Sequence, residues 1–188
     1  MLFKEESQKA RKRAIRYLVY RNRSRHEITC YLKRKNFPAN VVDDTLVFLE
    51  ENNYINDQRF AIQFGRSRIE NKKLGKLRIE RELDIKGIEK KVATEALNLL
   101  YEEYDEMEIA ISCAKKKLLS SSSTNSEKEG GRLAGFLKRK GFPTDIIYKV
   151  VTNLVQYDSS TDLTPPSDSS NNDPRESDSL QLGLISDE

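Results

Sequence analysis

The sequence has no tryptophan, two cysteines, one histidine and only 8 glycines among its 188 residues. Glycine-rich phosphate loops and tight β turns therefore have little to draw on. Cys30 and Cys113 lie far apart, and we expect reduced thiols in a cytoplasmic protein rather than a disulfide or a metal site. No apolar run approaches the ~20 residues of a membrane-spanning helix, so we expect no membrane partner.

Residues suited to catalysis are equally scarce. His26 is the only histidine, and the acidic pairs Asp43–Asp44 and Glu50–Glu51 fall where we expect solvated helix faces. General acid–base chemistry needs a substrate pocket and partner groups, and the sequence indicates neither. A hydrolytic enzyme is therefore the least supported class, and we expect a protein with no catalytic activity and no cofactor.

Charge is abundant but unevenly distributed. The chain carries 33 Lys and Arg against 30 Asp and Glu, a net charge of +3. Residues 156–188 hold eight of the acids and one base, so this segment carries −7 and residues 1–155 carry +10. The segment is rich in Ser, Asp, Asn and Pro, which is typical of a disordered tail. A basic body with an acidic tail indicates a polyanionic partner and an internal competitor for it.

An internal repeat organises the body. The heptapeptide LKRKNFP at 32–38 recurs as LKRKGFP at 137–143, and a diverged copy, LDIKGI, lies at 83–88. Apolar residues around the copies share one helical frame, which indicates a triplicated unit of about fifty residues. The frame comprises Ile28, Leu32, Phe37, Val41, Leu46 and Leu49; Ile79, Leu83, Ile88, Val92, Leu97 and Leu100; and Leu133, Leu137, Phe142, Ile146, Val151 and Leu154.

Each copy predicts a pair of helices with a defined start and stop. Ser24 and Glu27 have the spacing of a capping box at the start of the first pair. Pro38 suits the first turn of the following helix. Residues that tolerate a left-handed backbone separate the two helices of each pair. These stop residues are Asn36, Gly87 and Gly141.

A further helix precedes each pair, at 9–21, 57–72 and 106–119. We expect Asp57 to cap the second of these helices and Phe60 to be a core residue. Gly75 aligns with Ser24 and is expected to start a helix.

The predicted fold is all-α, with three tandem three-helix repeats that form an elongated, curved module followed by a disordered acidic tail. The expected boundaries are 1–53, 54–104 and 105–156 for the repeats, 120–131 for a flexible linker inside the third, and 157–188 for the tail.

Three ordered motifs carry a resemblance to a known family. They are YINDQRFA at 54–61, GKLRIEREL at 75–83 leading into KGI at 86–88, and RNRS at 21–24. Over roughly residues 10–155 the chain resembles the RecX family, whose members bind and restrain the RecA recombinase. The resemblance implies tandem three-helix repeats, no catalysis, and binding in the groove of the RecA–DNA filament with inhibition of its ATPase, strand-exchange and coprotease activities. It also implies roles in DNA repair, recombination and the SOS response.

The partners that we expect are accordingly a RecA filament and DNA, single-stranded first and double-stranded second. We expect the chain to act as a monomer.

Basic residues gather at the same place in two successive units. A single Lys or Arg usually solvates a helix face, and cations suit the negative end of a helix. Recurring clusters in a body of charge +10 favour contact with phosphate or with an acidic protein surface. The candidate binding residues are Arg21, Arg23, Arg25, Lys33, Arg34, Lys35, Arg66, Arg68, Lys72, Lys73, Lys76, Arg78 and Arg81.

An independent DNA-binding protein of tandem helix-turn-helix type is the alternative. Segments 24–36 and 38–50 have the length of that motif. A sequence-specific reader needs polar base-contacting residues at the start of its second helix. The segments PANVVDD at 38–44 and PTDIIYK at 143–149 offer apolar and acidic residues there, which argues against insertion into the major groove.

Overall fold

The computed structural model describes residues 2–120 and 126–159, and within these residues the chain forms nine helices and no strands. The all-α prediction is confirmed. None of the described helices is long and apolar enough to span a lipid bilayer. The helices are α1 (Leu2–Val19), α2 (Arg25–Arg34), α3 (Ala39–Glu51), α4 (Asp57–Lys72), α5 (Lys76–Ile85), α6 (Lys90–Glu103), α7 (Glu106–Leu119), α8 (Ser126–Lys140) and α9 (Thr144–Ser159).

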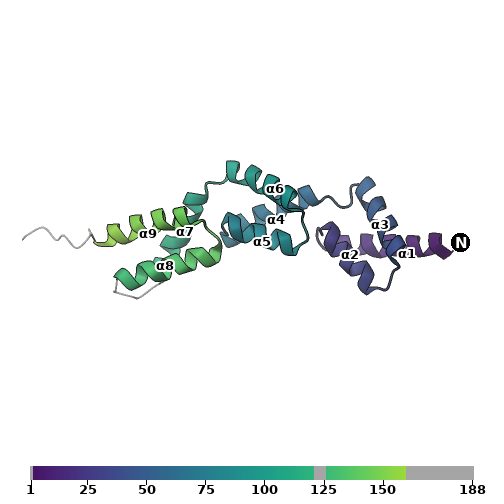
Figure 1. The fold of residues 1–188 in the computed structure, drawn as a ribbon, viewed down its shortest axis with the longest axis horizontal. Coiled ribbons are helices and arrows are strands. Elements are labelled where there is room, and N and C mark those ends of the chain that lie inside the picture. Colours follow the sequence, from purple (N-terminus) through teal and green to yellow (C-terminus); the bar gives the residue numbers. More distant parts are fainter. Residues whose placement is uncertain (1, 121–125, 160–188) are drawn as a thin grey trace, which may run out of the picture.

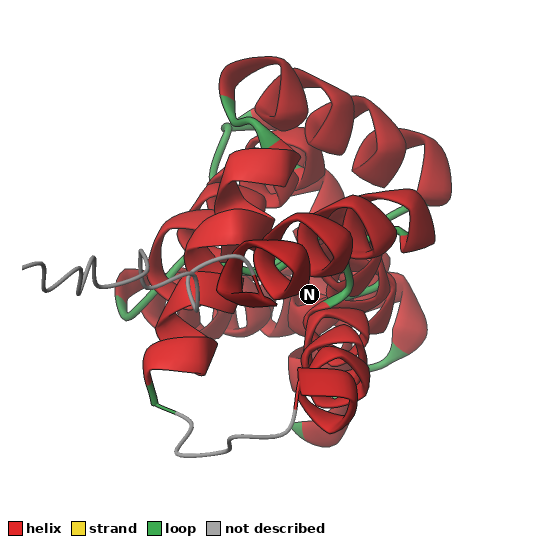
Figure 2. Cartoon of the chain, turned by 90° about the vertical axis from the view of Figure 1, so that its left-hand side faces the viewer, coloured by secondary structure: helices red, strands yellow, loops and turns green. Residues whose placement is uncertain are grey.

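The helices form three units joined end to end. Figure 1 shows them in a row, with α1–α3 at one end, α4–α6 in the middle and α7–α9 at the other end. In Figure 2, which looks along this row, the units overlap. The third helix of each unit packs against the first two helices of the same unit. The predicted elongated arrangement of three-helix repeats is therefore confirmed.

The repeated apolar frame forms the core of each unit. Burying one such aliphatic side chain contributes about 1.5–3 kcal/mol relative to leaving it exposed. The helix stops also follow the prediction, because Asn36, Gly87 and Gly141 have positive φ angles of 60°, 70° and 89°. Frame residues with at most 1% exposure are Ile28, Leu32, Val41, Leu46, Leu49, Ile79, Leu83, Leu97, Leu100 and Leu137.

The helix starts confirm one predicted cap and correct another. Glu27 N–H donates to Ser24 Oγ at 3.1 Å and Ser24 N–H donates to the Glu27 carboxylate at 3.3 Å, which completes the capping box. The prediction that Asp57 caps α4 is wrong. Asn56 is the cap, since it has an extended backbone and its side chain accepts from Arg59 N–H at 2.8 Å.

Of two further predictions near helix starts, the one for Pro38 is off by one position and the one for Phe60 is confirmed. Pro38 lies at the N-cap of α3, one position before the first turn in which we placed it. Phe60 is a core residue, with 5% of its surface exposed.

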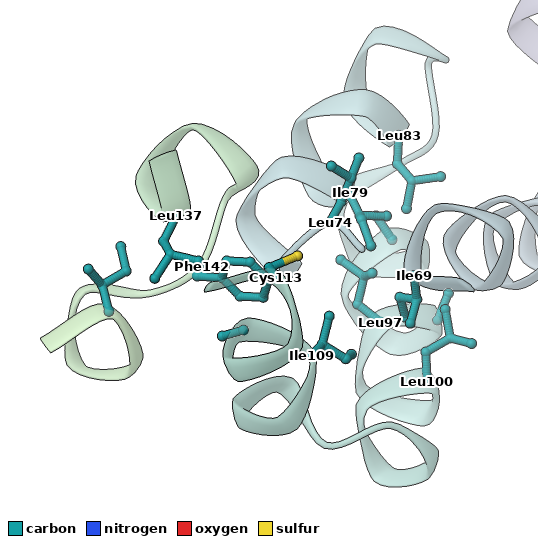
Figure 3. Close-up of a cluster of buried hydrophobic side chains, with 14 of the residues drawn as sticks. Ile69, Leu74, Ile79, Leu83, Leu97, Leu100, Ile109, Cys113, Leu137 and Phe142 are labelled. Carbon is teal, nitrogen blue, oxygen red and sulfur yellow. The ribbon is translucent and has the colours of Figure 1, made fainter. Parts of the chain in front are cut away.

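The three units contain two separate hydrophobic cores. One core lies within α1–α3, and Ile55 joins it although we placed Ile55 in the second repeat. The other runs without a break from α4 to α9, and Leu74, Cys113 and Phe142 lie between the second and third units in it (Figure 3). The second and third units are therefore joined by apolar packing, whereas the first has a core of its own.

The third unit contains less linker than we expected. The helix α8 begins at Ser126, so residues 126–131 are helical. The remaining linker residues 121–125 and the acidic segment 160–188 lie outside the described residues, and α9 runs through Ser159, beyond the expected start of the tail at 157.

Candidate functional site

The second and third units meet at two glycines. Gly75 is the N-cap of α5, as expected, and its N–H donates to the Lys140 carbonyl at 2.9 Å. Leu77 N–H donates to the Gly141 carbonyl at 3.1 Å. A Cβ on Gly75 would lie 2.5 Å from the Gly141 oxygen, and a Cβ on Gly141 would clash with Arg78. Glycine at both positions therefore lets the end of α8 approach the start of α5.

The first and second units meet in the same way, with polar groups. Ser24 aligns with Gly75, and its hydroxyl donates to the Lys86 carbonyl at 2.6 Å. The Lys86 ammonium reaches back to the Glu27 carboxylate at 3.0 Å. In the other junction the corresponding Lys140 ammonium donates to a backbone carbonyl of α4, at 2.7 Å. Both junctions thus join the start of the second helix of one unit to the end of the second helix of the next.

A carboxylate from the following unit caps each of these helix starts. Asp57 accepts from Arg25 N–H at 2.8 Å, and Glu106 accepts from Lys76 N–H at 2.7 Å. Burial raises the pKa of Asp57 and of Glu106 above their ordinary values, and the hydrogen bonds from the backbone oppose that rise. One free N–H group at the start of each of α2 and α5 is thus satisfied by a carboxylate of the next unit, which helps to orient consecutive units.

The junction between the second and third units leaves an open cleft of about 960 Å³, lined by the C-terminal ends of α4, α7 and α8 and by one face of α5. Seven lining residues are basic and only Glu70 and Glu82 are acidic. We call it the basic cleft. Its cations are Lys72, Lys73, Arg78, Lys116, Lys117, Arg139 and Lys140.

Five of the seven cations form no hydrogen bond or ion pair within the described structure. Glu82 is paired with Arg68 at 2.6 Å and with Arg78 at 3.2 Å, and these contacts outweigh its burial and lower its pKa. Lys140 is turned toward the backbone of α4. The side chains that form no hydrogen bond or ion pair with another described residue are Lys72, Lys73, Lys116, Lys117 and Arg139.

Helix electrostatics explains part of this arrangement. Lysines in the last turns of α4, α7 and α8 complement the negative ends of three helices. Each such end is equivalent to about −0.5 of a charge, so three ends supply about −1.5. Five unpaired cations exceed this compensation. The basic cleft therefore keeps a positive excess that an anionic partner can neutralise.

The wall of the cleft is apolar and chemically unreactive. Leu74, Cys113 and Phe136 line it, and the Lys140 ammonium lies 5.7 Å from the Phe136 ring centroid. Burial raises the pKa of the Cys113 thiol, so this thiol is protonated at neutral pH and is a poor nucleophile. Among the described residues, no group of His, Cys, Asp and Glu could hold a metal ion. The arrangement is suited to binding.

The predicted binding residues do not form one surface. The structure brings Lys72, Lys73 and Arg78 together in the basic cleft. Six others pair with side chains of their own unit. Arg21 donates to Glu27, Arg25 to Glu50, Arg66 to Glu103, Arg68 to Glu82 and Lys76 to Asn98, and Arg23 forms an ion pair with Glu27 at 3.9 Å. The remaining four lie elsewhere, with Lys33, Arg34 and Lys35 at the exposed end of α2 and Arg81 in a cavity of about 350 Å³.

The arginine cluster of the first unit is partly structural. The Arg23 guanidinium lies 3.9 Å above the Tyr17 ring, and Tyr17 stacks on Tyr31 with centroids 4.0 Å apart. Both rings are half-buried beside the core of the first unit. Arg23 therefore helps to hold α1 against α2 and is a weaker candidate for binding a partner.

The candidate set missed the cations that the third unit contributes. These are Lys116 and Lys117 on α7 and Arg139 and Lys140 on α8. The sequence did carry a signal, because residues 138–140 belong to the repeated heptapeptide and residues 115–117 read KKK. The sequence does not predict that the C-terminal ends of α7 and α8 lie beside the end of α4.

The helix-turn-helix alternative gains no support from the second helix of the first pair. Val41 and Val42 lie in the first turn of α3, and at most 1% of either side chain's surface is exposed. One side of the start of α3 therefore packs into its own core, and the exposed side carries Ala39, Asn40 and Asp43, with no cation for a phosphate.

Three family models match consecutive parts of the chain. They describe the first, second and third three-helix domains of RecX and match residues 10–49, 56–97 and 103–151. A curated relative, the regulatory protein RecX of Geobacillus sp. (strain WCH70), is 28% identical over 80% of this chain and 55% of its own length. The corresponding protein of Oceanobacillus iheyensis is 31% identical over 80% of this chain and 55% of its own length. The chain thus spans about half the length of these relatives.

Solved structures agree with the family models. A crystal structure of RecX from Lactobacillus salivarius superposes with a TM-score of 0.71 at 26% identity, and the match covers 80% of this chain and 97% of that one. A second structure, of regulatory protein RecX, gives a TM-score of 0.72 at 25% identity over 79% of this chain and 73% of that one. The chain belongs to the RecX family of regulatory proteins.

Proposed function

We propose that this chain regulates the RecA recombinase by lying along the RecA–DNA filament and inhibiting its ATPase, strand-exchange and coprotease activities. Its relatives are named regulatory proteins, and the filament as target is our inference from the family. The observation that carries the proposal is the basic cleft, with five unpaired cations between two units that share one core. In this proposal the chain acts in the cytoplasm as a monomer.

The shape of the molecule suits a long, repetitive target. Units joined end to end can contact successive protomers of a filament (Figure 1). Once one unit is bound, the others act at a raised local concentration, so several weak contacts combine into tight binding. Inhibition then requires no chemistry from this chain. Occupation of the groove by a rigid body hinders the movement of subunits and the entry of other DNA.

The cleft supplies the electrostatic part of this binding. Lysine and arginine side chains contact phosphate oxygens or the carboxylates of an acidic protein surface with charge-assisted hydrogen bonds. Each phosphate that the cleft neutralises releases counterions, so binding to nucleic acid weakens as salt rises. DNA binding is therefore proposed as one component of filament binding.

A binding comparison tests the proposal against the helix-turn-helix alternative. Labelled chain is titrated with RecA filaments on single-stranded DNA, with the same DNA alone and with duplex DNA. A filament regulator binds the filament at least tenfold more tightly than naked DNA. Equal or tighter binding to a naked duplex would instead support an independent DNA-binding protein.

Charge reversal locates the binding surface. The variant K72E/K73E/K116E/R139E reverses four unpaired cations of the basic cleft, and we expect its affinity for the filament to fall about a hundredfold, which corresponds to roughly 3 kcal/mol. The matched control, K9E/K12E/K91E/K149E, makes the same change in charge at exposed positions outside the cleft. An equal loss in both variants would show that net charge, rather than the cleft, governs binding.

A further inference from the structure

We propose that the acidic C-terminal segment of this chain, residues 160–188, binds in the basic cleft and competes there with polyanionic partners. The inference rests on the proposed function, since it describes how the same site is regulated. It begins from the cleft, where five cations form no hydrogen bond or ion pair with another described residue. Such an excess of one charge favours an occupant of the opposite sign.

The segment has the charge and length of such an occupant. Residues 160–188 contain seven acids and one base, a net charge of −6, and five of the acids fall within residues 162–178. An extended peptide spans about 3.3 Å per residue, so this acidic stretch reaches across the cleft with its carboxylates spaced along it. The residues that precede it, 1–159, carry a charge of +9.

The point where the segment leaves the described structure is also suitable. The helix α9 packs against α7 and α8, the two helices that contribute three of the five unpaired cations, and its 16 residues carry the chain about 24 Å from Thr144, beside the junction, to Ser159. For a chain of 29 residues, the random-coil relation gives a typical end-to-end distance of about 30 Å. The acidic segment can therefore return to the cleft from the end of α9 without any change in the helical body.

Tethering makes this binding effective although each contact is weak. A segment joined by a short flexible linker has an effective concentration on the order of 1 mM at its site. If the free segment binds with a dissociation constant of about 100 μM, the tethered segment lowers the apparent affinity of a competitor about tenfold. Salt screens such contacts, with a Debye length of about 10 Å at 0.1 M, so the competition fades as salt rises.

The test uses a full-length chain in which the seven acids of the segment are replaced by their amides. This neutral-tail variant carries D162N, D168N, D173N, E176Q, D178N, D187N and E188Q and keeps the length of the wild-type chain. A fluorescent peptide with the sequence of residues 160–188 is then added in trans, without RecA or DNA. We expect it to bind the neutral-tail variant and to bind the wild-type chain about tenfold more weakly, because the wild-type cleft is occupied.

The site is tested by combining the neutral tail with the cleft reversal K72E/K73E/K116E/R139E or with the control reversal K9E/K12E/K91E/K149E. We expect the peptide to lose binding with the first and to retain it with the second. A peptide that binds the wild-type and neutral-tail chains equally, or that loses binding equally with both reversals, would overturn the proposal. Since no RecA is present, this failure would leave the filament proposal untouched.

A competition measurement provides the functional consequence. Single-stranded oligonucleotide is titrated into the wild-type and neutral-tail chains at low and high salt. We expect the neutral tail to strengthen binding about tenfold at low salt and to have little effect at high salt. Superimposable curves at low salt would show that the segment does not occupy the cleft.

Discussion

At the scale of single residues, equivalent positions of the repeat have acquired different tasks. Lys35, Lys86 and Lys140 occupy the same position in the three units. The Lys35 ammonium lies 5.9 Å from the Tyr31 ring centroid, the Lys86 ammonium binds Glu27, and the Lys140 ammonium binds a backbone carbonyl of α4. The repeated basic heptapeptide is thus mainly scaffold. Of the three equivalent lysines, Lys86 and Lys140 bind groups of the preceding unit.

The stop residues show the same differentiation. Gly87 and Gly141 both lie where an added Cβ would strike the preceding unit, at His26 and Arg78 respectively. Asn36 occupies the corresponding place in the first unit, where its Cβ meets no preceding unit within the described structure. The choice between glycine and asparagine therefore reflects whether another unit packs against the helix stop.

We predict that Gly141→Ala destabilises the chain by about 2–4 kcal/mol, because a left-handed backbone and a steric clash both oppose the added methyl group. The control is Gly131→Ala, since a Cβ at Gly131 meets nothing within 4 Å. Urea unfolding measures the free energy of both variants. If both changes cost the same, the close approach at Gly141 is not the cause.

At the scale of elements, the sequence predicts helices better than it predicts their contacts. The ranges 57–72 and 106–119 coincide with α4 and α7, because periodicity and capping are local signals. The N-cap of α4 is Asn56, one residue before the predicted Asp57. The basic cleft was only partly predicted, because it brings together the ends of α4, α7 and α8, which lie about 20 to 70 residues apart in the chain.

Local sequence signals also do not predict that the second and third units share one core. Leu74 precedes the N-cap of α5 and is buried in the continuous core, whereas Arg23 holds the corresponding place before α2 and stacks on Tyr17. Thus apolar Leu74 precedes the N-cap where two units share a core, and basic Arg23 precedes it where the cores are separate. The effect is clear only when the two junctions are compared in three dimensions.

The junction between the first and second units gives a prediction on pH. Burial of Glu27 raises its pKa, but hydrogen bonds from Arg21, Lys86 and the Ser24 backbone outweigh burial and lower the pKa from 4.5 to about 2. A lowered carboxyl pKa stabilises the fold above pH 4.5, and this contribution disappears as the pH falls toward 2. The Glu27 side chain is only 14% exposed, so its contacts are weakly screened.

We therefore predict that Glu27→Gln lowers the free energy of unfolding by about 1–3 kcal/mol at pH 7 and by much less at pH 2. Glu51→Gln, which changes an exposed carboxylate of α3, serves as the control and should have little effect at either pH. Urea titrations at a series of pH values provide the measurement. A Glu27→Gln penalty that stays constant from pH 7 to pH 2 would show that the charge of Glu27 does not stabilise the junction.

At the scale of the whole molecule, the arrangement combines a long body with one cleft lined mainly by basic residues. Three units extend in a row (Figure 1), and five unpaired cations line the cleft where the second unit meets the third. The first unit differs from the other two in having a separate core and in meeting the second unit through polar contacts.

The most direct test of regulation is the ATP turnover of RecA on single-stranded DNA, measured at increasing concentrations of this chain. The account predicts that turnover falls in a saturable manner with the wild-type chain and with the K9E/K12E/K91E/K149E control. With K72E/K73E/K116E/R139E, the concentration needed for half-inhibition should rise about a hundredfold. Unchanged turnover at saturating wild-type chain, or equal inhibition by the cleft variant, would contradict the account.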